Sequence, residues 1–213
     1  MQANELLGLN IAMAKILAGL TDDASRQFFQ DAVGTIINFK KLSEVEFQEL
    51  NILSQMQYIN DYSYFYASSK IALKVAESEI KEAKAMGLTV FGGWITLGGL
   101  LSSEALHLIL GYQLKYQKVL KKFDSDIERG IDFSLEKYRQ ELQMYISDFK
   151  SFKKCTDIGS FRNNKEEIFI EYTQRYLRFI LGMLLLFYVA KAGIECFEND
   201  TVIKNLDLSK YGL

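Results

Sequence analysis

The sequence predicts an all-α protein built as a bundle of long helices, and two observations carry that prediction. The chain has 213 residues and no proline, whereas about ten prolines are typical of this length. Proline is excluded from helix interiors because it lacks the N–H group and clashes with the preceding turn. The β-branched, turn-punctuated stretches that indicate strands are also missing. We therefore expect long helices in a single helical domain, residues 1–213.

Charge and cysteine content narrow the functional classes. Lysine and arginine number 25 against 27 acidic residues, a net charge of −2, so the chain as a whole does not indicate a nucleic-acid partner. Cys155 and Cys196 lie far apart in a chain too large to need a disulfide for stability. We expect two reduced thiols and no disulfide framework.

The N-terminal residues 1–20 predict an amphipathic helix. No secretory signal is expected, because a positive first region is absent and Glu5 and Lys15 interrupt the apolar residues. The helix either docks on the core or anchors at a membrane surface, although its polar face lacks the Lys and Arg enrichment of such anchors. Its apolar stripe consists of Leu6, Leu9, Met13, Ile16, Leu17 and Leu20.

Two further helices are expected before residue 86. Thr21 to Asp23 would cap a helix over 22–38, and Ser43 followed by Glu46 fits a capping box for a helix over 44–85. Spacings of three and four residues place the apolar side chains of this last helix on one face. That face is formed by Tyr62, Phe65, Tyr66, Ser69, Leu73, Ala76, Ile80 and Ala83.

Residues 86–112 are apolar and rich in glycine. Small side chains recur at steps of 4, 3, 4, 3 and 4, a pattern that lets two helix backbones approach closely. Four interior glycines would cost an isolated helix in water about 4 kcal/mol. We therefore expect a bilayer, a tightly packed core, or a helix that the glycines break into a hairpin or an extended apolar tongue. The predicted helix-packing seam is Ala85, Thr89, Gly92, Thr96, Gly99 and Ser103.

Glu104 and His107 lie one turn apart inside this apolar run. If the run is embedded in a bilayer, they form an intramembrane polar pair, and Glu104 is the residue expected to influence ion passage. The alternative is a hydrogen-bonded carboxylate at an interface, without a function. His107 is the single histidine of the chain, which excludes Ser-His-Asp, Cys-His and multi-histidine sites within one chain. With no CxxC, HExxH, Walker or EF-hand spacing either, we predict no catalytic, cofactor or metal site and no enzyme.

A long amphipathic helix is expected over residues 113–154. Its apolar positions follow steps of 4 and 3 over three heptads, which is close to the minimum for a coiled coil. They form either an assembly seam between chains or a helix face packed on its own bundle. The seam is Ile131, Leu135, Tyr138, Leu142, Tyr145, Phe149 and Phe152.

The second apolar stretch, residues 176–197, follows a loop at 155–164 and a helix start capped by Asn163 or Asn164. Arg178 and Lys191 can extend their charges past its apolar centre, which makes the stretch long enough to cross a bilayer. A short docking helix is expected in the tail, 198–213.

These features favour a non-enzymatic, membrane-associated helical protein. In this interpretation, segments 86–112 and 176–197 enter a lipid bilayer, and the chain associates with copies of itself or with a helical protein. The roles that fit are an oligomeric channel, a pore-forming effector or toxin, and a membrane scaffold. The alternative is a soluble interaction module, such as an adaptor, immunity or secreted effector protein, that buries both apolar segments.

Overall fold

The computed structural model describes residues 22–96, 102–130, 135–145 and 165–211. Helix accounts for 87% of these residues and none of them is in a strand, which confirms the all-α class. The expected N-terminal helix 1–20, the loop 155–164 with its capping asparagines, and Cys155 lie outside the described residues.

The described residues form two compact units. Unit 1 takes its described residues from 22–75, 135–140 and 186–211, and unit 2 from 76–96, 102–130, 141–145 and 165–185. The expectation was a single domain without a linker. The boundary between the units lies inside continuous helices and not at a linker. Helices α4 (Ile52–Thr96), α6 (Leu135–Gln143) and α8 (Lys165–Glu198) contribute to both units.

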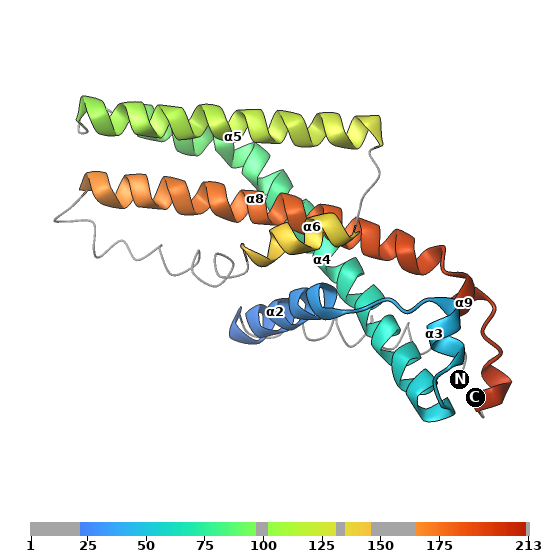
Figure 1. Ribbon diagram of the computed structural model, residues 1–213. Coiled ribbons are helices and arrows are strands. Elements are labelled where there is room, and N and C mark those ends of the chain that lie inside the picture. The colour runs from blue at the N-terminus through green and yellow to red at the C-terminus, as the bar shows by residue number, and fades with distance from the viewer. Residues whose placement is uncertain (1–21, 97–101, 131–134, 146–164, 212–213) are drawn as a thin grey trace. The chain divides into compact units, whose positions relative to one another are not determined.

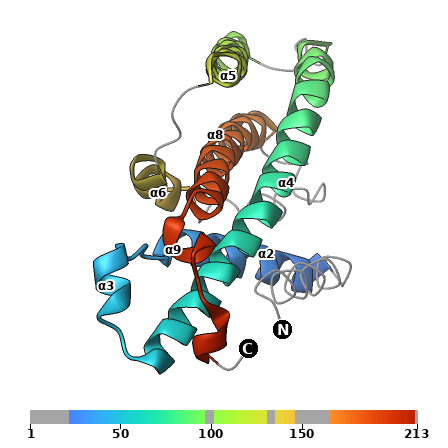
Figure 2. The same ribbon diagram turned by 90° about the vertical axis from the view of Figure 1, so that its right-hand side faces the viewer.

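Unit 1 is organised around the first half of α4. Figures 1 and 2 show helix α2 crossing this part of α4, while α3 lies beside its first turns. The buried face of α4 matches the predicted stripe: its members from Tyr62 to Ala83 are buried, except for the half-buried Leu73. The helices that lie wholly within unit 1, among the described residues, are α2 (Asp22–Asn38), α3 (Glu44–Gln48), α9 (Thr201–Lys204) and a 3-10 helix (Leu208–Tyr211).

The capping box at Ser43 is confirmed, but the helix that it starts is short. Ser43 Oγ accepts a hydrogen bond from the Glu46 N–H (3.3 Å), and the Glu46 carboxylate accepts one from the Ser43 N–H (2.8 Å). The expected single helix over 44–85 is divided, since α3 ends at Gln48 and α4 begins at Ile52. Gln55 Nε2 stabilises this break by donating to the carbonyls of Phe47 and Leu50, at 3.1 and 3.0 Å.

The C-terminal half of α8 forms the centre of unit 1. The five consecutive residues 186–190 are all buried. Five residues cover more than one helical turn, so protein encloses this part of α8 on every side. At Gly193, α8 approaches α4 so closely that a Cβ atom would lie 2.7 Å from Ser69 Oγ.

Unit 2 contains a helical hairpin formed by the end of α4 and by α5 (Ser103–Arg129). The hydroxyl of Tyr116 donates to the carbonyl of Ala83, and Lys84 pairs with Asp124. Segment 86–112 is therefore not one helix. Helix α4 ends at Thr96, and the extended residue Ser102 caps α5. The segment is therefore broken before α5, whereas insertion into a bilayer and close packing in a core stay predictions.

The expected long helix over 113–154 is also interrupted, and here the prediction was wrong. Helix α5 ends at Arg129, because Gly130 adopts the left-handed conformation (φ 58°, ψ 50°) and its N–H bonds back to the last turn. Glycine populates this region without the steric cost that other residues incur. The chain then forms a separate helix, α6.

Within the described residues, the segment Tyr176–Glu198 of α8 is the one stretch long and apolar enough to cross a membrane. It has 23 residues with a mean hydropathy of 1.8 at its most apolar, and 78% of that part is buried inside the protein. The second predicted segment, 86–112, does not form such a span within the residues described.

Candidate functional site

An aromatic cluster in unit 1 surrounds Tyr62 of α4. The Tyr62 ring stacks on Phe39 at 4.8 Å and meets Phe197 of α8 edge-on at 4.9 Å. Phe65 stacks on the same Phe39 ring at 4.5 Å, and Tyr66 stacks on Phe197 at 4.3 Å. Aromatic pairs of this geometry stabilise beyond the area that they bury. The cluster thus connects α4 to the chain after α2 and to the end of α8.

A buried carboxylate, Asp200, lies at the edge of this cluster. Its residue is 4% exposed. One carboxylate oxygen accepts from the Val202 N–H at 2.9 Å and caps α9. The other accepts from the Tyr62 hydroxyl at 2.9 Å and pairs with Lys41 Nζ at 2.8 Å. Both carboxylate oxygens of Asp200 therefore have hydrogen-bond donors.

These contacts fix the charge states of the group. Burial raises the pKa of Asp200. The hydrogen bonds from Lys41, Tyr62 and Val202 lower it by a larger amount, so the pKa lies below its ordinary value. Desolvation lowers the pKa of Lys41, and the bond to Asp200 more than compensates. Burial, together with Cys196 and Asp200, raises the pKa of the Tyr62 phenol well above its ordinary value. Asp200 is therefore ionised, Lys41 charged and Tyr62 protonated at neutral pH.

Two neighbouring groups extend this network. Cys196 Sγ lies 3.6 Å from the Tyr62 hydroxyl, which also approaches the Cys196 carbonyl at 3.3 Å. One turn along α4, the Tyr66 hydroxyl donates to Glu198 at 2.8 Å, and Lys70 pairs with the same oxygen at 3.1 Å. Two tyrosine–carboxylate–lysine groups thus attach the end of α8 and the chain after it to α4 and to the chain after α2.

The pKa values of Asp200, Lys41 and Tyr62 are displaced from neutrality in this network. General acid–base catalysis needs a group whose pKa lies near the working pH. The pKa of Asp200 is shifted down and those of Lys41 and Tyr62 are shifted up, so all three move away from neutrality. Among the described residues, no group of three or more His, Cys, Asp or Glu side chains is placed to hold a metal ion.

Arg139 of α6 is the least satisfied polar side chain in this region. The side chain is 14% exposed, and its Nη1 lies 3.9 Å from Glu136. Its buried Nε has no hydrogen-bond partner among the described residues. Desolvation lowers the pKa of Arg139, while Glu136 and Cys196 raise it in part. The guanidinium contributes positive charge near Cys196.

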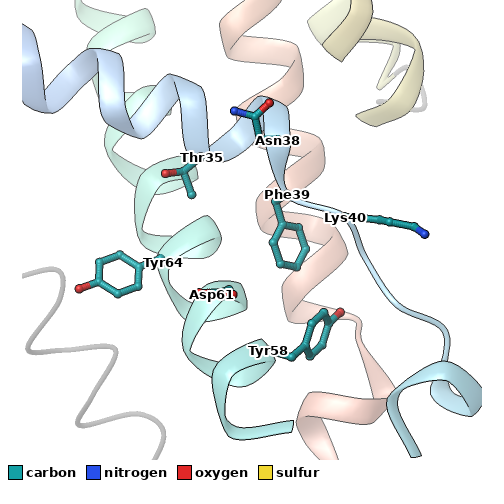
Figure 3. Close-up of a pocket in the computed structure, with 7 residues that line it drawn as sticks. All are labelled: Thr35, Asn38, Phe39, Lys40, Tyr58, Asp61 and Tyr64. Atoms are coloured by element: carbon teal, nitrogen blue, oxygen red, sulfur yellow. The ribbon is translucent and has the colours of Figure 1, made fainter. Parts of the chain in front are cut away.

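A shallow pocket of about 380 Å³ lies between the end of α2 and α4. Figure 3 shows Phe39 and Tyr58 facing a common space, while Lys40 and Tyr64 point away in opposite directions. The pocket holds one carboxylate, Asp61, which accepts a hydrogen bond from Gln57 at 2.7 Å. Its lining is Thr35, Asn38, Phe39, Lys40, Tyr58, Asp61 and Tyr64.

The predicted helix-packing seam is divided between two helices. Ala85 lies exposed on α4 and Ser103 is the first residue of α5. Thr89, Gly92 and Thr96 lie on α4, whereas Gly99 lies outside the described residues. The continuous seam on one helix does not form, since Ser102 is extended and starts α5. Close packing by the α4 part of the seam stays a prediction.

Glu104 and His107 occupy the first turns of α5, and both side chains are exposed. His107 Nδ1 lies 2.7 Å from the Ser103 carbonyl. Glu104 is the acidic residue of the first turn, where a negative charge interacts favourably with the helix dipole. This interaction gives Glu104 a local role at the start of α5, and the expected role in ion passage stays a prediction.

The described part of the predicted assembly seam contacts α8 of the same chain. In unit 1, Tyr138 stacks on Tyr188 at 5.0 Å. In unit 2, Arg178 lies 5.7 Å from the centre of the Tyr145 ring. Leu142 is fully buried and Leu135 is half-buried, while Ile131, Phe149 and Phe152 lie outside the described residues. These contacts favour a helix face packed on its own bundle.

Helix α4 also has an exposed apolar face that was not predicted from the sequence. Leu53 is 78% exposed, and Ile52, Met56 and Tyr64 are 59, 37 and 49% exposed. Positions 53, 56 and 64 differ by three and eleven residues, which places them on one side of a helix. The signal was present in their spacing, but the buried stripe from Tyr62 onward dominated the interpretation of this helix.

Comparison of the chain with protein-family models, with curated proteins and with solved structures finds no match.

Proposed function

We propose that this chain is a non-enzymatic helical interaction protein that uses α8 as an internal core helix and binds helical partners through exposed faces. The observation that carries the proposal is the burial of α8. A helix facing lipid exposes an apolar side to the acyl chains, whereas residues 186–190 are buried around the whole circumference of the helix. A helix that is apolar all round and enclosed by protein is typical of a core.

The polar network supports a binding role over a catalytic one. Its groups have complementary partners and pKa values displaced from neutrality, as described for Asp200, Lys41 and Tyr62. Such groups fix the chain and do not exchange protons at neutral pH. In contrast, the apolar side chains of α4 at Ile52, Leu53 and Met56 lie exposed, and a partner helix would cover them.

Membrane association is the second candidate, favoured by the length and apolar character of Tyr176–Glu198. Membrane association would explain why this segment is apolar enough for insertion into a bilayer. The enclosure of the same helix by protein favours a core helix over a single span that faces lipid. A transmembrane helix inside a bundle can be enclosed, so an experiment must separate the two candidates.

The test is the behaviour of the full chain without detergent and with lipid vesicles. The interaction protein is expected to be monodisperse without detergent and to stay out of the vesicle fraction on flotation. Val189→Arg places a charge at a fully buried position and is expected to unfold the protein in water, whereas Glu195→Arg, at an exposed position of α8, is tolerated. Aggregation without detergent, together with flotation of the parent, would reject the proposal and favour the membrane protein.

A further inference from the structure

Helix α5 of unit 2 has an outer side that faces away from the helices packed against it. Helix α4 contacts the inner side, where the Tyr116 hydroxyl donates to the carbonyl of Ala83. Helix α8 contacts the inner side as well, since the Tyr176 ring lies 5.9 Å from the Tyr116 ring. The side of α5 opposite these contacts is therefore available to a partner. The buried residues of α5 are Ala105, Ile109, Tyr116, Leu120 and Phe123.

This outer side of α5 is basic. Residues 105–123 contain four lysines and no aspartate or glutamate, and the acidic residues of the helix lie before and after this stretch, at Glu104 and from Asp124 onward. Lys122 pairs with Asp126 at 2.6 Å, and the other three lysines have no ion pair with a residue that the structure describes. We call this surface the basic face. Its members, all of them exposed, are Leu108, Leu114, Lys115, Lys118, Lys121 and Lys122.

The basic face is broad and contains two apolar side chains. At about 100° of turn per residue, its members spread over about 140° of the helix surface, from Lys121 to Leu108. Leu108 and Leu114, which are 50 and 67% exposed, lie on either side of Lys118. A single partner helix contacts a narrower stripe and would leave one of the two leucines uncovered. A flat surface can contact the whole face, because long lysine side chains reach it from both flanks of the helix.

We propose that the basic face of α5 binds the surface of a membrane that contains anionic phospholipids. Each lysine near such a surface strengthens binding about fivefold, and exposed leucines can enter the boundary between headgroups and acyl chains. The phosphates of a nucleic acid would attract the same lysines but offer Leu108 and Leu114 nothing apolar. The proposal goes beyond the proposed function, because α8 stays a core helix and the contact with lipid is peripheral.

Peripheral binding differs from insertion in its dependence on lipid charge. Vesicles of phosphatidylcholine alone carry no net charge, and the full chain should stay out of their fraction on flotation, as the proposed function expects. Vesicles with about 30% phosphatidylserine should carry the chain into the floating fraction at low salt. High salt should release it, because salt screens the charges. Insertion of Tyr176–Glu198 would instead take place with both kinds of vesicle and would resist salt.

Two double variants of the full chain show whether the basic face makes the contact. Lys118→Gln with Lys121→Gln removes two charges from the face and should bind the anionic vesicles about 25-fold more weakly than the parent. Lys74→Gln with Lys81→Gln, at two exposed lysines of α4, is the matched control, since it changes the net charge by the same amount. The control should bind as tightly as the parent. All four positions are exposed, so neither variant removes a core contact.

Leu114→Gln tests the apolar part of the contact. It removes no charge, so it should weaken binding to the anionic vesicles severalfold and leave the salt dependence unchanged. If Leu114→Gln binds as the parent does, the face recognises charge alone and the choice of a lipid surface is wrong.

A parent that stays out of the anionic vesicle fraction at low salt would overturn the proposal. So would equal losses of binding in the two double variants, because the contact would then not involve the basic face. Either result leaves the proposed function standing if the chain is monodisperse without detergent. A chain that requires detergent and floats with the neutral vesicles would overturn both this proposal and the proposed function.

Discussion

Replacing Gly193 with alanine tests how closely α8 packs on α4. A Cβ at this position would lie 2.7 Å from Ser69 Oγ and 2.9 Å from Phe65 Cζ. Carbon atoms in contact prefer about 3.5 Å or more, so the Phe65 ring would have to move by roughly 0.6 Å. That ring is fully buried and stacked on Phe39 at 4.5 Å, which leaves it little room to move.

Two opposing effects set the magnitude. Alanine is favoured over glycine in a helix by about 1 kcal/mol, while overpacking a core costs about 1–3 kcal/mol. We expect Gly193→Ala to lower the free energy of unfolding by about 1 kcal/mol net. Gly111→Ala is the matched control, because a Cβ there meets nothing within 4 Å. It should raise the free energy of unfolding by up to about 1 kcal/mol.

Urea denaturation followed by the helical circular dichroism signal measures both changes. The double variant Ser69→Ala with Gly193→Ala removes the nearest obstructing atom, the Ser69 hydroxyl oxygen, and should recover part of the loss. If Gly193→Ala stabilises the protein as much as Gly111→Ala does, α8 does not approach α4 at this distance and the packing argument fails.

Three further outcomes follow from the described contacts. Asp200→Asn should lower the free energy of unfolding by about 2 kcal/mol at pH 7, since Lys41 keeps its charge but loses its partner, and thermal denaturation measures the loss. The pKa of Asp200 is lowered in the folded protein, so its contribution is present above the ordinary pKa near 4 and disappears as the pH falls through the folded value. A difference between parent and variant that did not begin to shrink as the pH falls below that ordinary pKa would contradict this assignment. Tyr62→Phe should cost about 1 kcal/mol in the same assay, and no change would show that the bond to Asp200 contributes nothing. Gly130→Ala should cost about 1 kcal/mol because φ is 58°, and an unchanged urea midpoint would argue against a left-handed cap.

Local signals in the sequence were sufficient for much of the fold. Helix α2 was predicted over the residues it occupies, and the Ser43–Glu46 capping box is present, because a cap depends on neighbours within one turn. The end of α5 was missed although Gly130 was visible in the sequence. The heptad spacing from Ile131 onward predicts one continuous helix. Gly130, immediately before Ile131, instead ends α5.

The polar network could not be predicted in the same way. Tyr62 was correctly placed on the buried face of its helix, but Asp200 lies in the polar tail, where the sequence carries no sign of burial. The partnership depends on the path of α8, which brings Asp200 within 2.9 Å of the Tyr62 hydroxyl. Periodicity reports which face of a helix is buried and does not report what covers it.

The same partnership has a consequence for the rate of folding. Tyr62 and Asp200 are 138 positions apart, and Tyr66 and Glu198 are 132 apart, and all of unit 2 lies in the intervening chain. Closing a loop of that length costs about 4 kcal/mol of chain entropy before any contact compensates for it. Helical proteins usually fold fast because their contacts are local. These contacts at the centre of unit 1 join residues far apart in the sequence, so we expect its refolding to be slow and α8 to dock last.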